Sequence, residues 1–289
     1  MIDKLEFRIE NLGGCGYTAP HFQKGYPYEI ITKPDTNYGD CRIIKKFIDG
    51  RQIDLMVIKT KPRKTNGSPV KISLNPNNYL NLSELLSTIS FLGHEKNFII
   101  TRIDHAVDIP IPLKDVLKVT NVKYKRNGKD YFETDNSDGF DYSKKGDYLG
   151  AYPEVLVIYD KAYESLKKDR YKRRRGEPIG INSRLELRQS KNKPIVPTIL
   201  ELASLAHLDP FSRVISQELI PRPRKNKAAR RKWDKLNEYI KHHGLYRASR
   251  ILNKNRNFKR DFGQLLIPSK LKEEITSRYH RDLRQFIGD

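Results

Sequence analysis

Two apolar runs joined by a tight turn constrain the fold of this chain more than any other feature of its sequence. The runs are residues 42–48 (RIIKKFI) and 51–59 (RQIDLMVIK), and Asp49-Gly50 separates them. Asp-Gly between apolar runs is the strongest short-range signal for a β-hairpin, because both turn positions need a positive φ. The sequence therefore predicts an antiparallel pair of strands here.

Other stretches also have the pattern of strands. Residues 4–10 (KLEFRIE) alternate polar and apolar side chains, which is typical of a strand with one buried face. Further strands are predicted at residues 69–75, 97–109, 147–161 and 181–189, and a second hairpin at residues 123–133 with Asn127-Gly128 at its tip. Strands that follow one another with few helices between them favour a mostly antiparallel sheet.

Helical patterns flank the strands and dominate the C-terminal end. Helices are predicted at residues 82–93, 113–119, 162–175 and 197–208, and again from Pro223 to the end. In the last of these, Leu271, Ile275, Tyr279 and Leu283 recur every four residues and form one apolar stripe. The sequence predicts an α+β fold, with a curved, mostly antiparallel sheet and flanking helices over residues 1–210, followed by a basic helical region over residues 211–289.

The charge of the chain favours a polyanionic partner. Its 289 residues include 56 Lys and Arg against 35 Asp and Glu, which gives a net charge of +21. A field of that sign attracts nucleic acid first and an anionic membrane surface second. The basic residues are concentrated in blocks at residues 171–175, 191–193 and 222–232, so a uniformly lysine-rich composition accounts for only part of the excess.

Features of secreted and membrane-spanning proteins are missing from the sequence. Cys15 and Cys41 have neither the spacing of a metal site nor the number needed for a disulfide framework. The longest apolar runs are far shorter than the ~20 residues of a membrane span, and the first residues alternate as a strand does, unlike a signal peptide. We expect a cytoplasmic protein with no membrane partner.

Two of the predicted strands carry acidic residues among arginines on one face. By the period of two, Arg102, Asp104 and Asp108 share a face of the first strand, and Arg184, Glu186 and Arg188 share a face of the second. In one sheet, Asp104 and Glu186 could meet over its surface, where hard oxygen ligands suit Mg²⁺ or Mn²⁺. The alternative is that these acids pair with the arginines in ion networks. His105 falls on the apolar face and is expected in the core.

A tyrosine ends the most apolar of the predicted strands. Residues 155–158 (VLVI) lead to Tyr159, and Lys161 shares its strand face. A phenol has an ordinary pKa of ~10, so a phenolate at neutral pH needs a nearby cation such as Lys161 or a metal ion. Attack of a phenolate on phosphorus conserves the energy of the phosphodiester, so that a cut strand can be rejoined. The alternative is a structural role for Tyr159.

The order of these motifs resembles the replication initiators of rolling-circle plasmids. The motifs are RIDHAVD (102–108), DYLGAYPEVLVIYDKAYE (147–164) and RLELR (184–188). That family has an R-x-D strand, a tyrosine segment ending in Y-D/N-K, and an R-x-E strand, in the same order. The opening MIDKLEFRI is also similar to the initiators of filamentous phages. The resemblance covers roughly residues 1–210, and it does not distinguish between a plasmid and a phage as the element that encodes the chain.

The resemblance implies that the chain nicks one DNA strand at an origin and joins itself to the 5′ phosphate. Tyr159 would be the nucleophile, and Lys161 would lie beside the phosphate. Asp104 and Glu186 would hold Mg²⁺ or Mn²⁺, with Asp108 as a weaker ligand. The implied partners are the origin duplex or a hairpin, the single strand at the nick, a host helicase or polymerase, and a second copy of the chain.

A set of basic residues is expected to hold the DNA. They are Arg173, Arg174, Arg175, Arg188, Arg224, Lys225, Arg230 and Arg231. Residues 243–263 also resemble the two short helices of a helix-turn-helix, with Gly244 as a turn or helix stop. Two other functions fit the sequence: a DNA-binding protein without catalysis, such as a repressor or origin binder, and an RNA-binding module.

Overall fold

One large antiparallel sheet forms the centre of the protein. The computed structural model describes residues 1–9, 28–48, 51–64, 70–90, 98–122, 131–133, 146–151, 154–161, 183–190, 196–253 and 257–288. Within these residues, ten strands form the sheet in the order β2-β3-β4-β5-β1-β6-β11-β10-β9-β8. The strands are β1 (Ile2–Ile9), β2 (Tyr28–Thr32), β3 (Tyr38–Ile48), β4 (Arg51–Pro62), β5 (Val70–Leu74), β6 (Phe98–Ile109), β8 (Tyr131–Glu133), β9 (Gly146–Ala151), β10 (Glu154–Asp160) and β11 (Ser183–Ser190).

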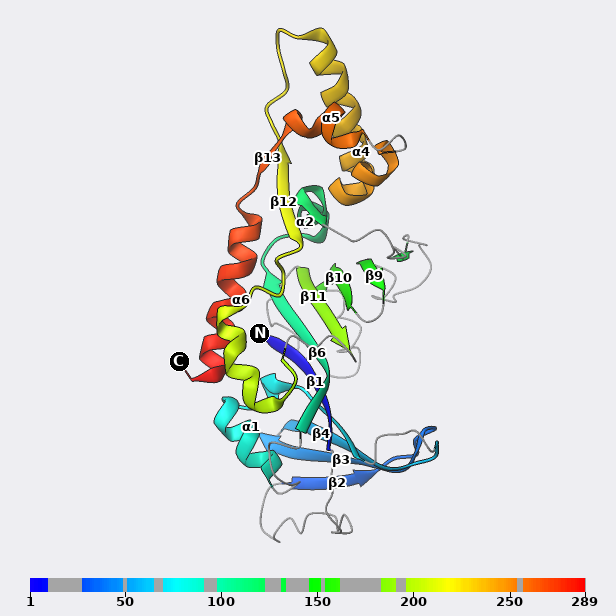
Figure 1. Cartoon of the computed structure of the whole chain (residues 1–289), viewed down its shortest axis with the longest axis vertical. Helices are drawn as coiled ribbons and strands as arrows, with labels where there is room; N and C mark the ends of the chain where they lie inside the picture. Colours follow the sequence, from blue (N-terminus) through cyan, green and yellow to red (C-terminus); the bar gives the residue numbers. More distant parts are fainter. Residues whose placement is uncertain are drawn as a thin grey trace.

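All pairings between these strands are antiparallel. Strands β3 and β4 pair with Ile48 opposite Arg51, so Asp49-Gly50 is the two-residue connection between them. The hairpin predicted from the sequence is therefore confirmed. Strand direction turns markedly between β2, β3 and β4 at one end of the sheet and β6 and β11 further along (Figure 1). The predicted α+β class is confirmed.

Helices cover one side of the sheet, as Figure 1 shows. They are α1 (Leu82–Ile89), the 3₁₀ helix η6 (Ile199–His207) and α6 (Leu271–Ile287), and a further 3₁₀ turn, η1 (Pro76–Asn78), precedes α1. The predicted apolar stripe of α6 is buried, and it belongs to the same core as the apolar side chains of β1, β6, β10 and β11. Helix α6 thus packs on the sheet, although it lies in the predicted C-terminal region. The predicted domain boundary near residue 210 stays a prediction.

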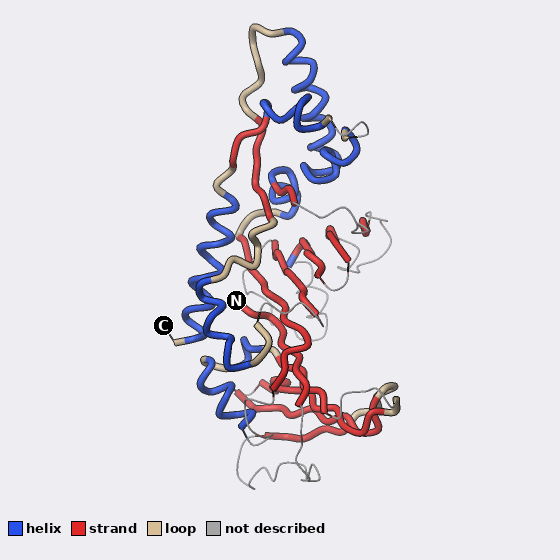
Figure 2. Tube along the Cα trace, viewed as in Figure 1, coloured by secondary structure: helices blue, strands red, loops and turns tan. Residues whose placement is uncertain are grey.

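A smaller helical part lies at one end of the molecule, joined to the rest by paired strands (Figure 2). It comprises α2 (Leu113–Val119), β7 (Thr120–Val122), β12 (Val214–Leu219), α4 (Lys227–Leu252), α5 (Phe258–Phe262), the 3₁₀ turn η7 (Gly263–Leu265) and β13 (Leu266–Pro268). Strands β13, β12 and β7 form a three-stranded antiparallel sheet. A second cluster of buried side chains, including Leu236, Ile240, Leu245 and Phe262, holds α4 to α5.

Helix α4 is two helices that meet at a kink. Gly244 lies within it at φ 74° and ψ 165°, a conformation that L-residues other than glycine rarely adopt. A Cβ atom on Gly244 would lie 2.8 Å from the carbonyl oxygen of Leu117 in α2. The glycine therefore provides both the kink and the close approach of α4 to α2, which agrees with the helix stop expected at this position.

Three expectations from the sequence were wrong or incomplete. Residues 147–161 form two strands, not one, because β9 and β10 pair with Ala151 opposite Glu154. The sequence between them contains Pro153, and a proline has a fixed φ and no N–H to donate. Strands β12 and β13 lie in stretches that were assigned no strand, and β2 and β7 were not anticipated. The helix expected at residues 197–208 is of the 3₁₀ type.

Some expected elements lie outside the described residues. These are the polar helix at residues 162–175 and the first arm and tip of the hairpin at residues 123–133, of which Tyr131–Glu133 pairs with β9. In the part of the chain that is described, no helix is long and apolar enough to cross a membrane.

The kink in α4 predicts a specific sensitivity to mutation. Gly244→Ala should lower the free energy of unfolding by about 2–3 kcal/mol. Alanine would be forced into a left-handed backbone conformation, and its Cβ would also clash with the carbonyl oxygen of Leu117. The matched control is Gly263→Ala, where φ is ordinary and the nearest atom, Cγ of Lys259, lies at 3.4 Å. Urea unfolding of both variants is the measurement. Equal stability of the two variants would contradict this account of Gly244.

Candidate active site

The central strands β6, β11 and β10 are neighbours, and their register brings the predicted site residues together. Asp104 lies opposite Arg188, and Asp108 lies opposite Arg184. Arg184 in turn lies opposite Tyr159 of β10. Because residues directly opposite one another point to the same face, these side chains share one face of the sheet, as the period of two predicted.

The other face of the same strands is the apolar core. Ile103, Val107, Leu185 and Ile158 join the core cluster that contains the stripe of α6. His105 also lies on this side, fully buried, with its Nδ1 2.7 Å from the hydroxyl of Tyr279. Burial lowers the pKa of His105 to about 3, so its imidazole is neutral at physiological pH. The prediction that His105 is a core residue is confirmed.

Each of the three predicted acids is bonded to an arginine. Arg102 donates to both oxygens of Asp104 at 2.8 and 2.6 Å. Arg188 donates to both oxygens of Glu186 at 2.7 and 3.3 Å. Arg184 donates to Asp108 at 2.5 and 2.6 Å and to Asp3 of β1 at 2.8 Å. The ion network that the sequence left as an alternative is thus present, and Asp3 is a member that the sequence did not suggest.

Tyr159 joins this network through its hydroxyl. The hydroxyl donates to Oε2 of Glu186 at 3.2 Å. The side-chain amine of Lys161 lies 6.0 Å from the centre of the Tyr159 ring. Tyr159 is buried, with 4% of its surface exposed. The phenol, the carboxylate and the amine are therefore close together, but solvent and ligands have little access to the phenol.

Two buried carboxyl groups in this network have opposite pKa shifts. Burial raises the pKa of Asp104 to about 6, and the negative charge of Glu186 adds to the effect, although the Arg102 guanidinium opposes it. Burial acts on Glu186 in the same direction, but hydrogen bonding and charge from Arg188, with help from Arg184 and Tyr159, hold the pKa of Glu186 below its ordinary value. Glu186 is therefore the ionised member of the pair, and Asp104 binds a proton near pH 6.

The carboxylate oxygens of Asp104 and Glu186 are the type of ligand that a hard divalent cation prefers, but their arrangement gives no further support for a metal site. Mg²⁺ is usually held by one or two carboxylates with several waters, and Asp104 and Glu186 could supply these. Their oxygens already accept hydrogen bonds from Arg102 and Arg188, so a cation would have to displace those bonds. Within the described ranges, no group of three or more His, Cys, Asp or Glu side chains is arranged to hold a metal. The metal site stays a prediction.

The residues predicted to contact DNA have different surroundings. Arg224, Lys225 and Arg231 are exposed at the start of α4 and just before it, and Arg230 is half-buried. Arg188 is bonded to Glu186, and its side chain is one-third exposed. Arg173, Arg174 and Arg175 lie outside the described residues.

Comparisons with protein-family models and with curated protein sequences give no match for this chain. The resemblance to rolling-circle initiators therefore rests on the sequence motifs alone and stays a prediction.

The raised pKa of Asp104 predicts how stability depends on pH. Between its ordinary value of 3.8 and about 6, the folded chain binds a proton at Asp104 that the unfolded chain does not. Stability contributed by this group is therefore greatest at low pH and falls as pH rises to about 6. The side-chain amide of the Asp104→Asn variant does not titrate. The free energy of unfolding should therefore depend on pH differently in the parent and in the variant.

Urea unfolding of both proteins at pH 4, 5, 6 and 7 measures that difference. The free energy of unfolding of the parent minus that of the variant should fall by about 1–3 kcal/mol as the pH rises from 4 to 7, because a pKa shift of one unit corresponds to about 1.4 kcal/mol. A difference that rises with pH would contradict the assignment, because it would mean that folding favours the ionised Asp104.

Proposed function

We propose that this chain nicks one strand of origin DNA and becomes joined to the 5′ phosphate through Tyr159. The observation that carries the proposal is the 3.2 Å hydrogen bond from the Tyr159 hydroxyl to Glu186, on a sheet face that also holds Asp104 and three arginines. These residues are far apart in the sequence, and they are the ones that the initiator-like motifs select.

The chemistry begins with the proton of the phenol. Glu186 is held ionised by its arginine partner, so it can accept or orient this proton, and the nearby Lys161 favours the phenolate. The phenolate oxygen forms a bond to phosphorus, the bond from phosphorus to the 3′ oxygen breaks, and that oxygen leaves with a proton as the 3′ hydroxyl. The reverse attack by a 3′ hydroxyl restores the phosphodiester and releases Tyr159.

Charge on the phosphate needs to be neutralised during this step. The guanidinium groups of Arg102, Arg184 and Arg188 surround the site and are candidates for this role. A divalent cation held by Asp104 and Glu186, with Asp108 nearby, would supply further neutralisation. Because Tyr159 is 4% exposed, the proposal requires that the residues covering it move when DNA enters.

The basic residues around the start of α4 would hold the DNA by its phosphates. Arg224, Lys225 and Arg231 are exposed there, at the end of the molecule that β12 and β13 carry away from the large sheet (Figure 2). Such contacts add affinity and fix register without reading sequence. We place this activity in the cytoplasm, with a host helicase or polymerase and a second copy of the chain as further partners.

A second function is favoured by specific observations. Each predicted acid is already bonded to an arginine, and Tyr159 is buried. These are the features expected of a DNA-binding protein without catalysis, in which the polar network stabilises the central strands. The same basic surface on α4 would then serve a repressor or origin binder.

Covalent attachment separates the two functions. Supercoiled plasmid carrying candidate origins, incubated with the protein and Mn²⁺, should yield relaxed circles with protein attached. Tyr159→Phe should abolish the adduct and keep DNA affinity, because only the attacking oxygen is lost. Tyr38→Phe, in β3, is the matched control and should behave as the parent does. Adduct formation by Tyr159→Phe at the parental rate would exclude Tyr159 as the nucleophile.

The role of α4 is tested by the salt dependence of DNA binding. Arg231→Ala should weaken binding to DNA duplexes of unrelated sequence by the same factor. It should also reduce the magnitude of the slope of log K against log salt concentration by about 1, since each phosphate contact contributes about 0.9 to that slope. Arg278→Ala on α6, where the arginine pairs with Glu274 at 2.9 Å, is the control of equal charge. Fluorescence anisotropy at several salt concentrations is the measurement. An unchanged slope for Arg231→Ala would remove this residue from the DNA surface.

A further inference from the structure

A groove lies between α6 and η6, on the helical side of the sheet. It has a volume of about 810 Å³ and is open to solvent along one side. Its polar lining comes from His207 of η6 and from Ser277, His280, Arg281, Arg284 and Gln285 of α6. The groove is separated from Tyr159 by the sheet, because α6 packs on the face that carries His105, not on the face that carries Asp104.

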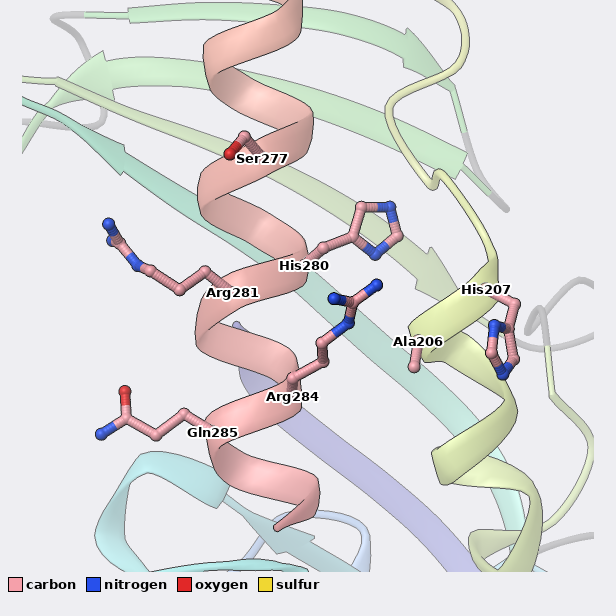
Figure 3. A pocket seen from close by; sticks show the side chains of 7 residues that line it. All are labelled: Ala206, His207, Ser277, His280, Arg281, Arg284 and Gln285. Carbon is pink, nitrogen blue, oxygen red and sulfur yellow. The ribbon is translucent and has the colours of Figure 1, made fainter. Parts of the chain in front are cut away.

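The groove-lining residues of α6 follow the spacing of one helix face. Ser277, Arg281 and Gln285 form one row with a spacing of four residues, and His280 and Arg284 form the adjacent row with the same spacing. The apolar stripe of the same helix packs on the sheet, so that stripe fixes how this polar face is presented. Figure 3 shows His280 and Arg284 projecting toward η6, where His207 lies, and Arg281 and Gln285 projecting from the other side of the helix.

The lining is basic, and only one of its two arginines has an acidic partner among the described residues. It contains two arginines and two histidines and no Asp or Glu. Arg281 pairs with Asp282 at 3.0 Å, whereas Arg284 makes no ion pair with any residue that the structure describes. The Nδ1 atom of His280 is buried and lacks a hydrogen-bond partner within the described ranges.

We propose that this groove binds a nucleotide, either free or as one unit of a nucleic-acid strand, through its phosphate. Arg284, with Arg281 at the rim, would bind the phosphate oxygens, because a guanidinium can donate two parallel hydrogen bonds to them. His280 would complete the phosphate site. His207 on η6 offers an imidazole on which a base can stack. The volume is within the range of small-molecule sites, about 300–1,000 Å³.

Calorimetric titration of the full chain with AMP, adenosine and inorganic phosphate tests the proposal. The parent should bind AMP and phosphate and bind adenosine at least about tenfold more weakly, since charge-assisted hydrogen bonds to the phosphate dominate. Arg284→Ala should lose at least about tenfold in AMP affinity, while Arg278→Ala, the same change on α6 at a residue outside the groove lining, should keep parental affinity. Arg284 is exposed, so its replacement should not disturb folding.

A short single-stranded oligonucleotide distinguishes the two sources of nucleotide. Loss of oligonucleotide affinity in Arg284→Ala, with AMP bound poorly by the parent, would assign the groove to a strand; loss of AMP affinity would assign it to a free nucleotide. Either outcome supports the groove as a phosphate site. If Arg284→Ala and Arg278→Ala bind all four probes equally, or if adenosine binds the parent measurably and as tightly as AMP, the proposal is overturned. The nicking assay is independent of these titrations.

Discussion

The register of three antiparallel strands, β6, β11 and β10, is the constraint on which the rest of the structure depends. It places Asp104 opposite Arg188, Asp108 opposite Arg184, and Arg184 opposite Tyr159. A shift of one residue in any of these strands would turn its charged side chains into the core and its apolar side chains out of it. The core side chains that pack against α6 therefore fix the polar face as firmly as they fix the apolar one.

The polar face is held together by charge in a largely dry environment. Asp104 and Glu186 are both buried, and each takes two hydrogen bonds from an arginine. Breaking a buried ion pair by removing one partner is far more costly than its formation is favourable, so these residues tolerate little change. The same property makes them suitable for chemistry, since preorganised charges act strongly where water is excluded. Structural and catalytic roles are therefore compatible at these positions.

The sequence predicted those features that depend on local pattern. The period of two assigned the correct faces of β6 and β11, Asp-Gly located a hairpin, and the four-residue spacing identified the buried stripe of α6. Features that depend on tertiary contact were not predictable in this way. Strands as short as β7 and β13, each of three residues, carry no periodic signal. Asp3 and Tyr279 meet their partners, Arg184 and His105, across separations of 181 and 174 residues, which no spacing rule encodes.

The identity of the residue that becomes joined to DNA is the most direct test of the account. After reaction of the parent protein with origin DNA, the adduct can be digested with nuclease and protease and sequenced by mass spectrometry. The account predicts one modified peptide, containing Tyr159 with a 5′-linked nucleotide on its phenol oxygen. A nucleotide on any other residue would contradict the assignment of the site to the face shared by Asp104, Glu186 and Tyr159.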